Sequence, residues 1–205
     1  MKATRHCYRN GNCRVIKIIP GQLLTDEWTA EIDWAKNNGV DVERNILKIA
    51  VIKRHMPTEH KGIGFLSGIG ITGAVASTVS HDSHNLVIIG ANDEDMMCVA
   101  NHVIEMGEDM LMSYYGKILA GLLLPITGLM SKLGAPELAE RNQEILHTVA
   151  SLGVSKEAVP LMTMDFVSLA VISSMKLTTK GLVDVGSLNE RAVPFQYGFF
   201  ELCHQ

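Results

Sequence analysis

The side chains best suited to chemistry form one short polar cluster, His81-Asp82-Ser83-His84-Asn85, between two apolar runs. Two imidazoles and a carboxylate could bind a metal ion, relay protons or hydrogen-bond a heterocycle. Asp-Ser favours a turn, which would bring His81 and His84 to the same side, whereas a straight strand would point them in opposite directions. The alternative is a loop braced by its own side chains, with Asp82 capping a turn and Asn85 at positive φ. The spacing leaves both interpretations open, and two histidines with one aspartate are too few ligands for a two-metal hydrolase.

Three more polar residues, Arg54, His55 and His60, flank the start of a glycine-rich stretch over 62–73. The fold could bring them close to the cluster, since functional side chains often gather on neighbouring loops. Solvated loop residues would have the same composition. We therefore treat Arg54 and His55 as secondary site candidates.

The glycine-rich stretch contains Gly68-Ile69-Gly70-Ile71-Thr72-Gly73, which matches G-x-G-x-x-G, and Asp93 follows twenty residues after Gly73. A dinucleotide fingerprint needs a helix to open directly after the glycines, because the pyrophosphate binds at the helix N-terminus. The residues that follow, 74–80, alternate small and β-branched side chains and predict a strand instead. We therefore expect the glycines to allow close approach of a backbone or ligand, and we keep Asp93 as a secondary site candidate.

Composition excludes several classes of protein. The chain has 205 residues, 47% of them hydrophobic, and a net charge of −4, so the basic surface of a nucleic-acid binder is missing. No apolar run reaches the roughly 18 residues of a membrane span, and the N-terminal residues lack the apolar region of a secretory signal. The four cysteines have no zinc-site spacing and, with eleven methionines, indicate a reducing cytoplasm.

Periodicity predicts several strands in the first half of the chain. Residues 14–19 form a short strand, and 27–36 alternate so that Trp28 and Trp34 share one buried face. Asn37-Asn38-Gly39 predicts a hairpin turn, since these residues tolerate positive φ. The nearly continuous apolar run 46–52 predicts a central strand, and residues 1–12 are expected to be frayed.

The second half alternates helices with strands. Asn92 is a good N-cap for an amphipathic helix over 92–107, and 138–152 form a second helix. Strands over 110–115 and 117–124 are expected to turn about Gly116, and 161–172 are expected to be extended. A turn at 178–181 precedes a strand over 182–185. Together these elements predict an α+β fold, a mixed or antiparallel β-sheet with two main amphipathic helices.

Longer motifs resemble the C-terminal portion of bacterial adenine deaminases, in the same order, from about residue 14 to 185. They include Gln22-Leu23-Leu24-Thr25, Ile46-Leu47-Lys48-Ile49-Ala50-Val51 with Arg54-His55, Gly64-Phe65, Gly73-Ala74-Val75-Ala76-Ser77-Thr78-Val79, His81-Asp82-Ser83-His84-Asn85, Gly90-Ala91-Asn92-Asp93-Glu94-Asp95-Met96, Leu124-Pro125-Ile126-Thr127-Gly128-Leu129-Met130-Ser131, Lys176-Leu177-Thr178 and Gly181-Leu182-Val183-Asp184-Val185. One departure is Gly107-Glu108-Asp109, where the family tends to be richer in glycine.

The family belongs to the amidohydrolase superfamily and hydrolyses adenine to hypoxanthine and ammonia. The resemblance implies that catalysis and metal binding lie in a different domain from the one that this chain resembles. A divalent metal (Mn, Fe or Zn) is bound in an N-terminal barrel that begins with His-x-His, a motif missing from this chain, so no cofactor is expected on the chain itself. It implies an N-terminal strand element over 1–42, the C-terminal-like domain over 43–190 and a tail over 191–205. The loop 81–85 would then approach the purine site or brace the barrel interface.

Two functional hypotheses follow from the resemblance. In the first, the chain is part of an adenine deaminase that acts in purine salvage, has the barrel domain or subunit as partner and is inactive alone. In the second, it is a free-standing purine-binding or assembly module that lost catalysis. A domain parted from its barrel would expose apolar surface, so we expect homo-oligomers that associate through the Trp28/Trp34 strand or the strand 117–124.

Overall fold

The computed structural model describes residues 11–55, 60–81, 83–106, 109–154 and 160–185. Over these residues it has one large sheet, a small hairpin, three α-helices and a 3₁₀ turn, η1 (Asn37–Gly39). The large sheet contains β1 (Gly11–Ile18), β2 (Thr25–Ile32), β3 (Ile46–Ile52), β4 (Lys61–Ser67), β5 (Ala74–Ser77), β6 (Leu86–Gly90), β7 (Asp109–Tyr114) and β8 (Lys117–Leu123). The hairpin is β9 (Met175–Thr178) and β10 (Gly181–Asp184), and the helices are α1 (Asp93–Met106), α2 (Ala135–Ser151) and α3 (Pro160–Val167).

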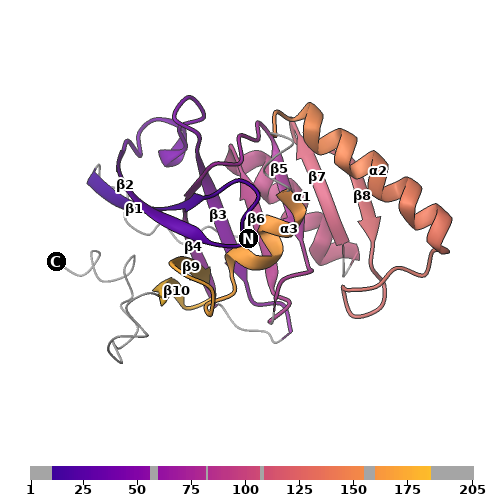
Figure 1. Ribbon diagram of the computed structural model, residues 1–205. Coiled ribbons are helices and arrows are strands. Elements are labelled where there is room, and N and C mark those ends of the chain that lie inside the picture. Colours follow the sequence, from indigo (N-terminus) through magenta and orange to yellow (C-terminus); the bar gives the residue numbers. More distant parts are fainter. Residues whose placement is uncertain (1–10, 56–59, 82, 107–108, 155–159, 186–205) are drawn as a thin grey trace.

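The strand order of the large sheet is β2-β1-β4-β3-β6-β5-β7-β8 (Figure 1). Strands β1 and β4 are parallel, and the other neighbouring pairs in the described sheet are antiparallel. The predicted α+β fold with a mixed sheet is confirmed. The two helices predicted from periodicity are α1 and α2.

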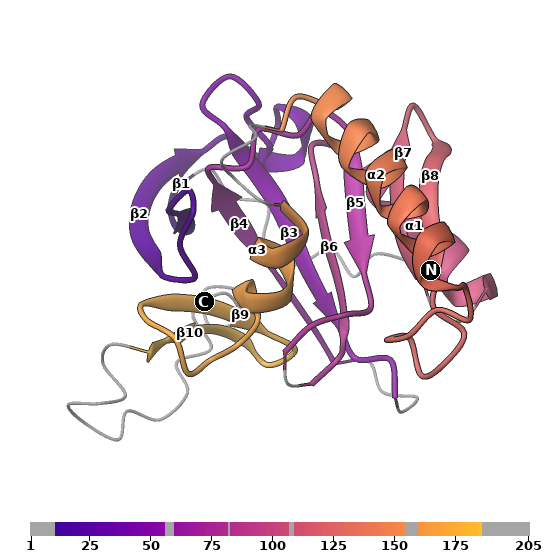
Figure 2. The same cartoon turned by 45° about the vertical axis from the view of Figure 1, so that its right-hand side comes forward.

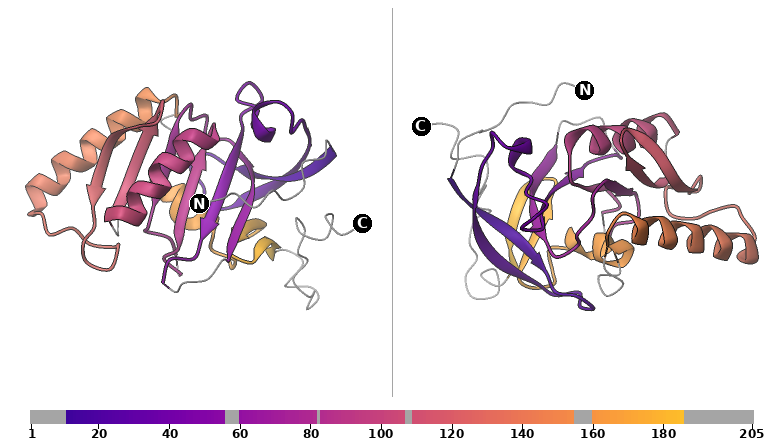
Figure 3. Two further views of the ribbon diagram at one scale, coloured as in Figure 1. Left: turned by 180° about the vertical axis from the view of Figure 1, so that it is seen from behind. Right: turned by 90° about the horizontal axis from the view of Figure 1, so that it is seen from above.

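The sheet is covered on both faces (Figures 2 and 3). Helix α1 packs its buried Val99 and Val103 on one face, against β5 and β6. Helices α2 and α3 and the β9–β10 hairpin cover the opposite face, where Ile145, Met164 and Leu177 join one hydrophobic core. None of the described helices is long and apolar enough to span a membrane.

The position of β3 inside the sheet explains why its sequence is apolar almost without interruption. It pairs with β4 on one side and β6 on the other. Ile49 and Val51 face the core under α2 and α3, while Ala50 faces α1. A strand buried on both faces has no solvent side on which to alternate, so the prediction of a central strand is confirmed.

The glycine-rich stretch leads into a strand, β5, as predicted. Gly73 lies so close to β7 that a Cβ atom there would overlap the carbonyl oxygen of Ser113. Close backbone approach is therefore the reason for this glycine. A helix does not open after the motif, so the structural context of a dinucleotide fingerprint is missing, as expected.

The prediction of an extended segment over 161–172 is wrong, because α3 occupies 160–167. Met164 and Val167 are three residues apart and both buried in the core under the sheet, which is helical spacing. A short apolar run cannot be assigned to helix or strand by periodicity alone. The packing of α3 on the sheet decides the outcome.

The turn at 37–39 also differs from the prediction. Asn37, Asn38 and Gly39 do have positive φ. They do not form a hairpin, because β2 pairs with β1 and the turn leads to β3 instead. The expected fraying of 1–12 is wrong at Gly11 and Asn12, which belong to β1, and residues 1–10 lie outside the described part.

Exposed apolar surface was expected at two places, the Trp28/Trp34 strand and the strand 117–124. Trp34 is only 9% exposed and its ring lies 5.1 Å from that of Phe65, so the exposed surface expected there is not found at Trp34, whereas Trp28 is half-buried. On the edge strand β8, Leu119 and Leu123 are each 46% exposed, as expected. Oligomerisation through β8 stays a prediction.

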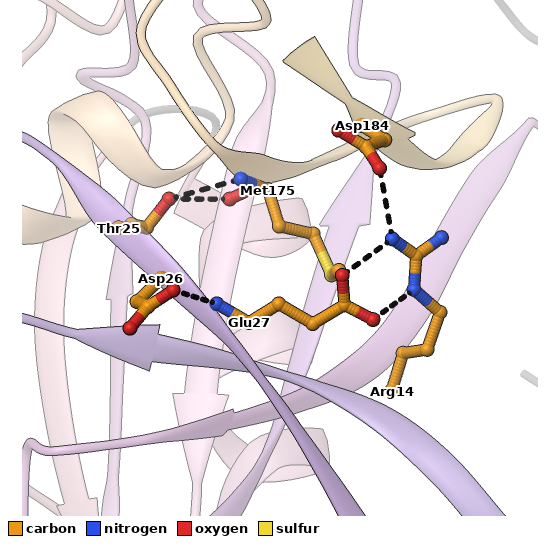
Figure 4. A network of polar contacts seen from close by, with 6 residues as sticks. All are labelled: Arg14, Thr25, Asp26, Glu27, Met175 and Asp184. Carbon is orange, nitrogen blue, oxygen red and sulfur yellow. Dashed lines mark hydrogen bonds and ion pairs between the residues drawn. The ribbon is translucent and has the colours of Figure 1, made fainter. Parts of the chain in front are cut away.

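Polar contacts tie the first strands to the last hairpin (Figure 4). The buried Thr25 hydroxyl donates to the Met175 carbonyl oxygen at 2.7 Å and accepts from the Met175 amide at 3.2 Å. Arg14 joins Glu27 and Asp184, with Nη2 3.1 Å from the Asp184 carboxylate. Segments far apart in sequence therefore depend on each other, and whether 1–42 form a separate element stays a prediction.

Candidate functional site

The candidate site lies at one end of the large sheet, where four segments meet. They are the residues after β3, the loop between β5 and β6, the loop after β8, and α3. Hydrogen bonds link the first three through Arg54, and His81 links the β5–β6 loop to α3. We call this set of side chains and loops the loop cluster.

The β5–β6 loop contains a backbone bond and a side-chain bond of its own, whereas the sequence interpretation of a braced loop was based on side chains alone. The His84 amide donates to the Ser80 carbonyl oxygen at 2.7 Å, and the Asn85 amide side chain donates to the Ser83 hydroxyl at 2.8 Å. Positive φ occurs at His84 (46°), so the prediction that Asn85 has it is wrong. Asp82 lies outside the described residues.

Arg54 connects two loops that are distant in sequence. Its Nε donates to the carbonyl oxygen of His84 at 2.6 Å, and its Nη2 donates to that of Thr127 at 2.5 Å. The guanidinium lies against Gly128, where a Cβ atom would come within 2.5 Å of Nη2. His55 Nε2 lies 3.1 Å from the same His84 carbonyl oxygen. Arg54 and His55 therefore belong to the loop cluster, and Arg54 organises it.

The two imidazoles of the loop lie near each other, with ring centroids 6.4 Å apart. His81 is exposed and its ring lies 4.7 Å from that of Phe166, at an interplanar angle of 32°. Its amide donates to the Asp165 carbonyl oxygen at 3.0 Å. Helix α3 therefore fixes His81 through both backbone and ring.

Asp165 is a site residue that the sequence reasoning missed. Burial raises the pKa of its carboxyl from 3.8 to about 6, and the charge of His81 acts in the opposite direction. Among the described residues, its buried Oδ1 has no hydrogen-bond partner. The available signal was a single acidic residue in an apolar run, Leu161 to Val167. This residue was not selected because the run was interpreted as an extended segment and not as a helix.

The raised pKa of Asp165 predicts a pH-dependent effect on stability. The folded carboxyl keeps its proton up to about pH 6, whereas the unfolded one loses it near 3.8, so this group lowers stability as pH rises between these values. Asp165→Asn should therefore raise the free energy of unfolding at pH 7.5 by about 1 kcal/mol, a shift discounted for partial exposure. The gain should vanish at pH 4.

Thermal unfolding followed by circular dichroism at the two pH values measures this effect. Glu140→Gln, the same change at an exposed carboxyl on α2, is the control and should leave stability nearly unchanged at both. An equal gain from Asp165→Asn at pH 4 and 7.5 would show that ionisation is not the cause.

Asp93 does not join the loop cluster. Its carboxylate pairs with Lys48 and accepts from the Asn38 side chain at 2.8 Å. It follows the end of β6, whereas the loop cluster precedes the start of β6, and five strand residues span about 17 Å. Asp93 therefore lies near the opposite end of the sheet.

The arrangement is suited to hydrogen bonding and to contact with another surface. Searched over the described residues, the chain has no group of three or more His, Cys, Asp or Glu side chains that could hold a metal ion. Cys13 and Cys98 are free thiols, and burial is the main cause of their raised pKa values. The divalent metal expected in the barrel stays a prediction.

The fold and site define an α+β domain with a polar loop cluster at one end of a mixed sheet. A sequence model of the adenine deaminase C-terminal domain matches residues 22–189, and the chain belongs to this family. The resemblance seen in the sequence motifs is thereby confirmed.

Three curated relatives are each named adenine deaminase. The one from Kosmotoga olearia is 43% identical over 176 residues, which are 85% of this chain and 30% of the relative. The one from Oleidesulfovibrio alaskensis is 43% identical over 86% of this chain and 31% of its own length. The one from Brucella abortus is 40% identical over 86% of this chain and 30% of its own length. The chain thus spans less than a third of the relatives it matches.

Proposed function

We propose that this chain acts as the C-terminal domain of an adenine deaminase and is inactive without a metal-binding barrel. The observation that supports this most directly is the family match over 22–189, together with relatives named adenine deaminase of which the chain spans about 30%. The reaction would be hydrolysis of adenine to hypoxanthine and ammonia. A divalent metal (Mn, Fe or Zn) in the barrel would activate the water.

The loop cluster is the part of the chain that meets the barrel or the purine site in this proposal. His81 and His55 are exposed there, and imidazoles can donate or accept hydrogen bonds near neutral pH. Met130, from the loop that Arg54 contacts, is 56% exposed. Exposed apolar side chains beside fixed polar groups are typical of a surface that another domain covers.

Complementation tests the proposal. The chain is mixed with a barrel made separately, namely the Kosmotoga olearia relative truncated to remove the segment that this chain matches. Neither part alone should deaminate adenine, and the mixture should, as measured by the absorbance change from adenine to hypoxanthine. His84→Ala should weaken the recovered rate at least tenfold, whereas His147→Ala, at an exposed position on α2, should not.

Two outcomes would contradict the proposal. Turnover by the chain alone, loaded with metal and abolished by His84→Ala, would indicate a local active site. An inactive mixture without complex formation, together with adenine binding to the chain in calorimetry, would favour the free-standing purine-binding module.

A further inference from the structure

An exposed imidazole and a buried carboxyl are neighbours in the loop cluster. Helix α3 holds His81 by the 3.0 Å bond from its amide to the Asp165 carbonyl oxygen and by the contact between its ring and Phe166. The Asp165 side chain belongs to the same turn of α3 as Phe166. One ring face of His81 therefore lies toward α3 while the residue remains exposed to solvent.

The surroundings of the Asp165 carboxyl favour His81 as its partner. Its Oδ1 is buried and has no hydrogen-bond partner among the described residues. His81 is the group whose charge acts on it. Of the other polar groups nearby, the hydroxyls of Ser80 and Ser168 bond to each other at 2.5 Å, and Arg54 is directed to the His84 carbonyl oxygen.

The charged and titratable groups around the pair come from three segments. Helix α3 contributes Asp165 itself, the β5–β6 loop contributes His81 and His84, and the residues after β3 contribute Arg54 and His55. Among the described residues of this set Asp165 is the carboxylate, and Asp82 of the same loop lies outside them. An imidazole N–H directed at a carboxylate gains a charge-assisted hydrogen bond, which is stronger than one between neutral groups.

We propose that Asp165 is a positioning residue, whose carboxylate accepts an N–H from the His81 ring and so fixes the tautomer of that ring. The other ring nitrogen is then an acceptor directed outward, for an N–H donor of the class to which the exocyclic amine of adenine belongs. This inference rests on the proposed function, in which the loop cluster faces the barrel. In the structure the His81 ring lies beside Phe166, so formation of the pair requires a rotation of the ring toward the Asp165 carboxyl.

The test uses the chain alone, so it does not depend on complementation. Nitrogen-15 chemical shifts of the histidine rings report which nitrogen carries the proton. At pH 8, His81 of the unchanged chain should populate one tautomer predominantly, and Asp165→Ala should convert it to a mixture. His147, exposed on α2, is the control in the same spectrum and should not change.

A second measurement follows Asp165 directly through its carboxyl carbon. Because the His81 charge lowers the pKa of this group, His81→Ala should shift its titration to higher pH than the value of about 6. Where Asp165→Ala does not fold, Asp165→Leu replaces it in the ring measurement, because this apolar side chain of similar size has no hydrogen-bond acceptor. A His81 tautomer ratio unchanged in the folded variant, or a carboxyl titration unmoved by His81→Ala, would overturn the proposal.

The reconstituted enzyme separates the two possible donors. If the His81 nitrogen meets the purine, Asp165→Ala should raise KM for adenine without weakening assembly with the barrel. If it meets a barrel N–H, the same variant should weaken assembly and leave KM unchanged in the saturated complex, which would overturn the assignment to the purine amine.

Discussion

Replacing Gly62 by alanine is expected to lower the free energy of unfolding by about 3 kcal/mol, the cost of forcing a methyl group into a filled contact. Gly62 lies in β4, directly under the β9–β10 hairpin. A Cβ atom there would overlap the carbonyl oxygen of Thr178, which is backbone and cannot rotate away. The hairpin would have to lift off the sheet, which would disturb the packing of Leu177 in the core. Thermal unfolding should show a midpoint about 6–12 °C lower.

Gly64→Ala is the matched control for this prediction. Gly64 lies two residues further along β4, on the same face, and its Cβ would meet the Leu177 side chain at an ordinary 3.5 Å. Alanine has a lower backbone entropy cost than glycine, so this change should be close to neutral or slightly stabilising. Equal losses from the two variants would mean that glycine flexibility in β4, and not the contact with the hairpin, is the cause.

The comparison of Gly62 with Gly64 also shows the limit of sequence reasoning about this fold. Close backbone approach was predicted for the glycines before β5, and Gly73 against Ser113 fits that interpretation. The sequence does not say which backbone approaches. At Gly62 it is Thr178, more than a hundred residues away, because loops bring β9 back across the sheet.

Short-range sequence patterns correctly predicted the strands and helix ends that depend on neighbouring residues in the chain. The alternation around Trp28 predicted β2, and the continuous apolar run of β3 predicted a strand buried on both faces. Asn92 caps α1 as expected, its side-chain oxygen accepting from the Asp95 amide at 2.8 Å. Each of these depends on residues within one turn or one strand, which is the range over which sequence patterns act.

The candidate site was predicted in part for the same reason. The polar loop was conspicuous because it interrupts apolar runs, and Arg54 and His55 were noted beside it. The importance of Asp165 depends on α3 folding back against the loop, so that His81 bonds to the Asp165 backbone across 84 positions. Asp93 was included because of a spacing rule, and its pairing with Lys48 near the other end of the sheet separates it from the loop.

Arg54→Ala should release two loops at once, and this is the largest effect expected within the loop cluster. The variant removes the hydrogen bonds to the His84 and Thr127 carbonyl oxygens. Bonds from a charged donor contribute about 1.5–3 kcal/mol each when buried, and partial exposure reduces the total here to about 2 kcal/mol. The amides of His84 and Gly128, which bond to Ser80 and Leu124, should then exchange hydrogen about 30-fold faster, while Ile49 in β3 stays protected.

Arg44→Ala is the control for the loss of an arginine with two partners. Arg44 bonds to the Asp41 carboxylate and to the Glu31 carbonyl oxygen, away from the loop cluster. It should leave exchange at His84 unchanged. If Arg44→Ala accelerates His84 as much as Arg54→Ala does, the effect is global destabilisation and Arg54 has no special role in the loop cluster.

Gly128→Ala tests the contact between Arg54 and the loop after β8 from the Gly128 side, and it leaves the Arg54 side chain in place. A Cβ at Gly128 would lie 2.5 Å from Arg54 Nη2 and 2.8 Å from Cζ, at a positive φ of 72° that alanine resists. The guanidinium would be displaced, so exchange at His84 should accelerate, although the bond from this loop to residue 128 comes from the Thr78 hydroxyl and not from His84. Because both single changes remove one contact, the double variant should expose His84 no further than Arg54→Ala alone. Additive losses at His84 would show that Arg54 and Gly128 act on this loop independently, and the loop cluster would then not be the single surface that the proposed function requires.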